Sequence, residues 1–182
     1  MAVLRSTVVR QAARLAPSSS SAAVLCAVPS TPPTFTIIRQ PPLIVAPDRP
    51  TPRRSLYLSN LDDQAGVRYQ IPRVLFYRSD CSKKKNAKDP VKIIKEALAK
   101  VLVHYYPFAG RLRDADNGKL TVDCTGEGVL FVEADADISL EDFGDLYPPI
   151  SRGDEFINNV PGSENITNSL LLLIQVRAPH IR

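Results

Sequence analysis

The chain has 182 residues, enough for one domain of ordinary size and too few for two large ones. Its formal net charge of +4 is unevenly divided, because residues 1–55 carry seven arginines and one acid for +6, whereas the rest carries −2. A mildly acidic globular part lacks the clustered basic surface that nucleic-acid binding requires, so we expect no nucleic-acid partner. The one lysine run, Lys83–Lys85 with Lys88, is typical of a solvated loop.

Cysteine usage and hydropathy restrict the chain further. Cys26, Cys81 and Cys124 are odd in number and form no Cys-x-x-Cys pair, which predicts a reduced protein without a disulfide framework or a bound metal. No apolar run, including the strongly apolar Leu170–Ile174, approaches the roughly 18 to 20 residues of a transmembrane helix. We therefore expect no transmembrane segment.

Residues 1–34 are predicted to be a disordered leader. They are rich in Ser and Ala and contain Arg5, Arg10 and Arg14 but no acidic residue, which is the composition of an organelle transit peptide. An extension without a targeting role is the alternative. A mitochondrion or a plastid is therefore the alternative to a cytoplasmic location.

The first half of the remaining chain reads as short extended segments and one helix. We predict a strand at Thr34–Arg39, extended chain at Leu43–Ala46, a turn at Asn60–Asp63 and, after Pro72, a strand from Arg73 to about Arg78.

The strongest predicted helix begins after Asp89, a favourable N-cap, with Pro90 at the first helical position. It ends before Pro107. Apolar residues at three- and four-residue intervals predict its buried face, which comprises Val91, Ile94, Leu98, Val101 and Tyr105.

The second half is predicted to be mainly strands. They are Arg111–Arg113, Lys119–Asp123 after the turn at Asp116–Gly118, Val129–Ala134 after the turn at Thr125–Gly128, and Leu170–Val176, which is apolar enough to be buried on both faces. One helical turn is expected at Asp137–Phe143, followed by a long loop that is rich in Pro and Asn. The fold class is α+β.

The histidines are weak candidates for a catalytic base. His104 lies in the last turn of the predicted helix, and the residue four positions later is Phe108, so a packing role is favoured. His180 is the third residue from the end of the sequence, where a side chain is poorly held for catalysis.

Three other features are also better explained by structure than by chemistry. Cys124 has no histidine placed to activate it, so we interpret it as a packed residue at a strand end. Gly126-Glu127-Gly128 precedes a strand rather than a helix, which is a poor phosphate cradle. The acidic stretch that starts at Asp135 has Leu140 and Leu146 where a calcium loop requires Gly and Glu, and is read as a solvated edge.

Several segments together resemble the BAHD acyltransferases of plant specialised metabolism, in particular the branch of benzyl alcohol O-benzoyltransferases and related alcohol or taxane acyltransferases. The resemblance covers about residues 35–176. The segments that carry it are Pro42–Pro52, Leu58–Asp63, Tyr69–Tyr77, Asp89–Arg111 with its Tyr-Pro-Phe-Ala-Gly-Arg, Val122–Gly128 and Leu170–Val176.

The resemblance implies a fold related to chloramphenicol acetyltransferase, of which residues 35–176 would be part of the N-terminal domain and residues 177–182 an aberrant tail. It also implies transfer of an acyl group from acyl-CoA, as co-substrate, to an alcohol or amine by a cytoplasmic monomer with no permanently bound cofactor. The family's general base comes from a His-x-x-x-Asp motif, which this sequence lacks.

We therefore assign no catalytic and no metal-binding residue, leave cofactor-binding residues unknown, and predict a fragment that is inactive by itself. The alternative is a non-catalytic truncated product or pseudoenzyme that binds a partner through an exposed apolar face.

Overall fold

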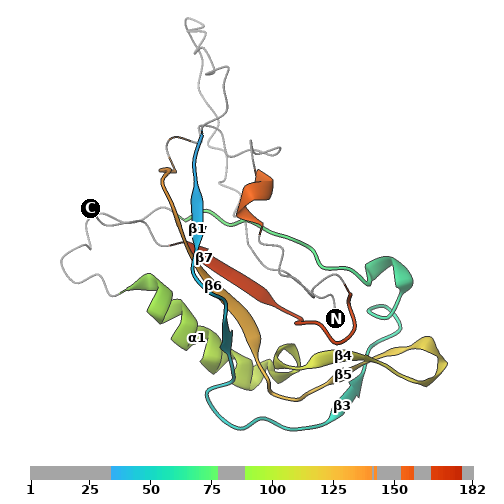
Figure 1. Ribbon diagram of the computed structural model, residues 1–182. Coiled ribbons are helices and arrows are strands. Elements are labelled where there is room, and N and C mark those ends of the chain that lie inside the picture. Colours follow the sequence, from blue (N-terminus) through green and yellow to red (C-terminus); the bar gives the residue numbers. More distant parts are fainter. Residues whose placement is uncertain (1–33, 78–88, 141, 143–152, 158–164, 178–182) are drawn as a thin grey trace, which may run out of the picture.

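A computed structural model describes residues 34–77, 89–140, 142, 153–157 and 165–177 of the chain. These residues form a four-stranded sheet, a three-stranded sheet and one α-helix (Figure 1). The predicted α+β class is confirmed. No helix within these ranges is long and apolar enough to cross a membrane.

The larger sheet is organised around β6 (Val129–Ala136). Strands β1 (Ile37–Arg39) and β2 (Leu43–Val45) pair antiparallel with successive parts of β6, with Ile38 opposite Asp135 and Val45 opposite Val129. On its other side β6 pairs in parallel with β7 (Leu173–Arg177). The expected strands at the start of this region and after the glycine-rich turn are thus present.

The smaller sheet has the order β3-β5-β4, formed by Ser55–Tyr57, Leu120–Asp123 and Arg111–Asp114. The predicted hairpin between β4 and β5 is confirmed, and its turn ends at Gly118, whose φ of 69° is readily adopted by glycine. The core of this sheet consists of buried Leu112, Leu120, Val122, Cys124 and Leu171.

The helix α1 (Pro90–His104) begins as predicted, with the Asp89 carboxylate accepting a hydrogen bond from the Val91 amide at 2.9 Å. It packs against the larger sheet, where Val91 and Leu102 join Val45, Val129 and Phe131 in one buried cluster. A short 3₁₀ helix, η3 (Tyr106–Ala109), follows and leads into β4.

The predicted buried face of α1 is wrong in part. Val91 is buried and Leu98 is half-buried, but Ile94, Val101 and Tyr105 are 40%, 49% and 60% exposed. Leu102, which the prediction omitted, is only 1% exposed. The centre of the buried face is therefore rotated toward Leu102, because only part of the apolar arc lies over the sheet.

Two predicted strands differ from the structure. Residues 73–77 form no strand, and instead Phe76 packs edge-on against Phe156 with ring centroids 6.0 Å apart. The last strand begins at Leu173 instead of Leu170 and includes Arg177, and its residues are half-buried rather than buried on both faces.

Several expectations lie outside the described residues. These are the leader up to residue 33, Cys26, Cys81, the lysine run, Glu141 and Phe143 of the predicted helical turn, most of the long loop, and His180. The described residues 137–140 of that predicted turn are not helical.

Candidate functional site

The segment Tyr106–Arg111, which follows α1, brings its backbone very close to the backbone of β5. Gly110 lies against β5, where a Cβ atom on Gly110 would be 2.2 Å from the Asp123 carbonyl oxygen. Ala109 beside it is fully buried. Any side chain at position 110 would force the two strands apart, so this glycine is required for packing.

Arg111 is a buried arginine, 9% exposed, that joins the two sheets. Its Nη1 donates hydrogen bonds to the carbonyl oxygens of Gly110 at 2.7 Å and Gly128 at 3.0 Å, and its Nη2 lies 3.0 Å from Glu127 Oε2. Burial lowers the pKa of the Arg111 guanidinium, and the Glu127 carboxylate opposes that shift. The side chain remains a cation that is held on three sides.

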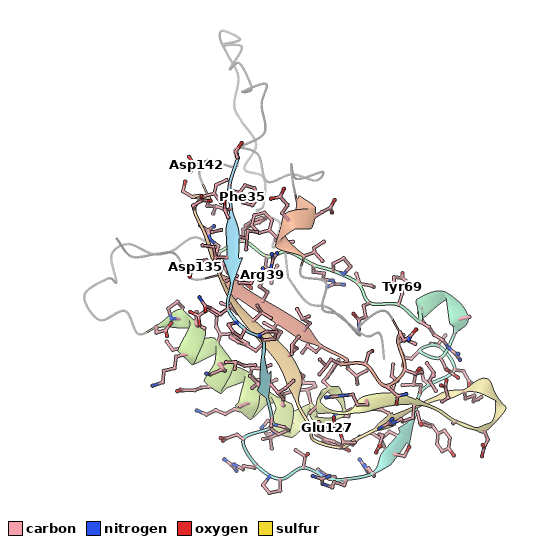
Figure 2. All side chains as sticks on the ribbon, viewed as in Figure 1. Phe35, Arg39, Tyr69, Glu127, Asp135 and Asp142 are labelled. Atoms are coloured by element: carbon pink, nitrogen blue, oxygen red, sulfur yellow. The ribbon has the colours of Figure 1, made fainter. Side chains whose placement is uncertain are left out.

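The glycine-rich turn before β6 completes this contact. Gly128 has a φ of 106°, and a Cβ atom there would lie 2.4 Å from the Val45 carbonyl oxygen of β2. Its amide donates to the Ala109 carbonyl at 3.0 Å. Figure 2 shows Glu127 where the two sheets meet. We call the set of Gly110, Arg111, Glu127 and Gly128 the Arg111 junction.

The Arg111 junction explains why the turn is no phosphate cradle. A cradle needs free backbone amides that converge on an anion, whereas the Gly128 amide is already bonded to Ala109. The sequence pointed to the segment that ends at Arg111 and to the turn at Gly126–Gly128, but not to the contact between them. No local pattern indicates that contact, because Arg111 and Gly128 are 17 positions apart.

Cys124 is fully buried at the end of β5, as predicted for a packed residue. Burial raises the pKa of its thiol, and the nearby Arg54 guanidinium opposes that rise. Its amide donates to the Arg54 carbonyl at 3.0 Å. A buried thiol with a raised pKa is a poor nucleophile.

His104 is the last residue of α1 and is exposed, so the predicted packing role of this side chain is wrong. The fourth residue after it, Phe108, packs against the core cluster of the larger sheet. An apolar side chain, Phe108, therefore occupies the position where a His-x-x-x-Asp motif beginning at His104 would have its acid.

The acidic stretch that starts at Asp135 interacts with protein groups. Arg177 on β7 donates to the carbonyl oxygens of Ala136 and Ile138, and burial lowers the pKa of its guanidinium while Asp135 opposes the shift. Asp142 accepts hydrogen bonds from Ser139, which lower the pKa of its carboxyl group. Within the described ranges no group of three or more His, Cys, Asp or Glu residues is placed to hold a metal ion.

A shallow depression of about 390 Å³ lies on the face of the larger sheet away from α1, between β1 and η6 (Gly153–Phe156). Arg39 at its wall donates from Nε to Gln175 Oε1 at 2.9 Å, and Gln175 donates to the Phe156 carbonyl. Figure 2 shows Arg39 on β1 above β7. The Arg39 guanidinium in the wall of this depression is therefore already bonded to protein groups.

Comparison with known families matches residues 36–178 to the Transferase family. Over 143 residues the chain is 56% identical to the benzyl alcohol O-benzoyltransferase of Petunia hybrida, 54% to the 13-hydroxylupanine O-tigloyltransferase of Lupinus albus and 53% to alcohol acyltransferase 1 of Actinidia deliciosa. Each match covers 78% of this chain, which spans only 31% of the length of these relatives.

The fold is similar to that of vinorine synthase in its crystal structure. The TM-score is 0.52 at 20% sequence identity, and the match covers 80% of this chain and 35% of that one.

Proposed function

Because this chain belongs to the Transferase family, the BAHD acyltransferases, we propose that it is one part of an enzyme that moves an acyl group from acyl-CoA to an alcohol. The observation that carries the proposal is the 56% identity to a benzyl alcohol O-benzoyltransferase over 143 residues. The fold is consistent with it, since 80% of this chain matches the fold of vinorine synthase with a TM-score of 0.52.

The described residues contribute a scaffold to this reaction. The Arg111 junction consists of groups that bond to one another, so it fixes the relative position of the two sheets and leaves no group free for proton transfer. Cys124 is buried and His104 has no acidic partner at the motif spacing.

We expect the 182-residue chain to be inactive by itself. The family's general base would deprotonate the acceptor hydroxyl so that the oxygen attacks the thioester carbon and CoA leaves as the thiol. Losing a positioned base removes a factor of about 10² to 10⁴ in rate. The sequence has no His-x-x-x-Asp motif to supply that base.

The substrates are proposed at the level of the branch. We propose benzoyl-CoA or acetyl-CoA as the donor and a small alcohol as the acceptor. The names of two relatives support a benzoyl group and an alcohol acceptor. We also propose a cytoplasmic monomer without a resident cofactor; fluorescence of residues 1–34 fused to a reporter in mitochondria or plastids would contradict that location.

A chimera tests the proposal. Residues 36–178 of this chain replace the matching part of the petunia enzyme, and CoA release from benzoyl-CoA is followed with a thiol reagent in the presence and absence of benzyl alcohol. We expect alcohol-dependent release by the chimera. A folded chimera without this release, tested with several acyl-CoA donors and alcohols, would contradict the proposed role.

The second candidate function is a non-catalytic product that binds a partner through an apolar face. The observation that favours it is the exposure of Ile94, Val101 and Tyr105 on α1. Size-exclusion chromatography of the chain from its natural tissue distinguishes the two, because this function requires a defined complex of the short chain.

A further inference from the structure

The link from β2 to β3 crosses from the larger sheet to the smaller one (Figure 1). We call residues 48–54 of this link the strap. The strap is held at its ends, because the Asp48 amide donates to a carbonyl on α1 and the Arg54 carbonyl accepts from the Cys124 amide, both at 3.0 Å. Between these anchors, the backbone of residues 49–53 forms no hydrogen bond with other described residues. This stretch can therefore leave the surface at a low cost in free energy.

Thr51 lies in the middle of the strap and is followed by Pro52. Thr51 is half-buried, whereas the residues on both sides of it are exposed. Pro50 and Pro52 have no N–H to donate, so they keep this stretch out of the neighbouring sheets. The strap is also basic, since it contains one acid and three exposed arginines, namely Arg49, Arg53 and Arg54.

We propose that Thr51 is a phosphorylation site for a proline-directed protein kinase. In this transfer the Thr51 Oγ1 oxygen bonds to the γ-phosphorus of ATP, ADP leaves, and the hydroxyl proton passes to the catalytic aspartate of the kinase. A kinase pocket that offers no acceptor to the next backbone N–H favours Pro52, because proline has no N–H to leave unpaired. An acidic groove beyond that pocket complements Arg53 and Arg54. The site does not depend on the proposed transferase function.

A phosphoryl group on Thr51 would lie beside the Arg111 junction. The Thr51 hydroxyl oxygen is 3.2 Å from the position that a Cβ atom on Gly126 would occupy, and Glu127 is the next residue. At pH 7 the phosphoryl group carries a charge of about −1.5 to −2. It therefore repels the Glu127 carboxylate, which is 50% exposed and lies 3.0 Å from the Arg111 guanidinium. Phosphorylation of Thr51 thus opposes this ion pair.

The site is tested by incubating the intact 182-residue chain with a purified cyclin-dependent kinase, which is proline-directed, and Mg-ATP. Mass spectrometry then locates and times the modification. Thr31-Pro32 is the other Thr-Pro pair of the sequence and has no arginine among the six residues after Thr31, so it is an internal control. We expect Thr51 to be phosphorylated about tenfold faster than Thr31, the ratio that one charge-assisted contact supplies.

Variants of the strap separate the two elements of recognition. Pro52→Ala, and the double variant Arg53→Ala with Arg54→Ala, should each slow the modification of Thr51 by about tenfold. Thr51→Ser keeps an acceptor hydroxyl and should still be modified. All of these variants should keep the far-ultraviolet circular dichroism of the parent chain, because the strap contains no helix or strand residue.

The effect on the Arg111 junction is measured by urea unfolding with and without phosphorylation at Thr51, in the parent chain and in Glu127→Gln. We expect phosphorylation to lower the urea midpoint more in the parent, because only the parent has a carboxylate beside the phosphoryl group. An absence of modification at Thr51, equal rates at Thr31 and Thr51, or an unchanged rate in Pro52→Ala would overturn the site. Equal changes of the midpoint in the two chains would overturn its effect on the Arg111 junction.

Discussion

Replacing Arg111 with Ala should be among the most destabilising changes in the described part of the chain. The substitution removes the donors to the buried carbonyl oxygens of Gly110 and Gly128 and the partner of Glu127. A buried acceptor left without a donor costs about 1 to 3 kcal/mol. With two such oxygens and the lost packing of a buried side chain, we expect the free energy of unfolding to fall by about 3 kcal/mol.

Two further variants separate the carbonyl contacts from the ion pair. Glu127→Gln should cost less than about 1 kcal/mol, because the Glu127 side chain is 50% exposed and a solvated ion pair contributes little. Arg111→Lys keeps the charge but loses the planar fork that reaches both carbonyls, so its cost should fall between the other two.

The assay is urea unfolding followed by far-ultraviolet circular dichroism, since the chain contains no tryptophan for fluorescence. A cost for Arg111→Ala no larger than that for Glu127→Gln would refute the conclusion that Arg111 holds the two sheets together.

Three other changes test the packing, the helix start and the buried thiol. Gly128→Ala should lower the free energy of unfolding by at least about 2 kcal/mol in the same urea assay, because position 128 has a positive φ and its new Cβ atom would clash with the Val45 carbonyl oxygen. Gly66→Ala is the control and should have little effect, because the space around Gly66 is open. Asp89→Ala should cost about 1 kcal/mol by removing the N-cap of α1, and an unchanged urea midpoint would contradict the capping role. The pKa of the Cys124 thiol is raised in the folded chain, so the stability that the neutral thiol contributes is present below the unfolded pKa of about 8.5 and is lost as pH rises above that value. Cys124→Ala should therefore reduce the fall of the free energy of unfolding with pH, measured by urea titrations at increasing pH. An unchanged fall with pH in this variant would contradict the role of the thiol.

Local sequence signals predicted the elements whose chemistry is local. Asp89 followed by Pro90 gave the start of α1 to the residue, because a cap acts within one turn. The hairpin between β4 and β5 followed from the turn residues that end at Gly118. These features depend on neighbours in the sequence, so they can be predicted without knowledge of the rest of the fold.

Features that depend on distant partners could not be predicted in the same way. Periodicity identified an apolar arc on α1 but not which part of it lies over the sheet, so Val101 was expected to be buried and is half exposed. The run that ends at Tyr77 has strand-forming residues, yet Phe76 packs by its side chain against Phe156 instead of pairing. Both outcomes are set by neighbours that are far away in the sequence.

The same limit applies to the Arg111 junction. The sequence shows an arginine after Ala-Gly and a Gly-Glu-Gly turn, but no pattern indicates that the guanidinium of the first bonds to the backbone of the second. A functional motif and a structural one look alike at that level. The contacts identify this motif as structural.

The most direct test of the whole account is a side-by-side measurement of alcohol-dependent CoA release by three purified proteins, namely the petunia enzyme, the chimera with residues 36–178 of this chain, and the 182-residue chain alone. The account predicts release by the first two at rates within about tenfold of each other, and none above the uncatalysed rate by the third. Release by the chain alone, or a folded chimera without release, would contradict it.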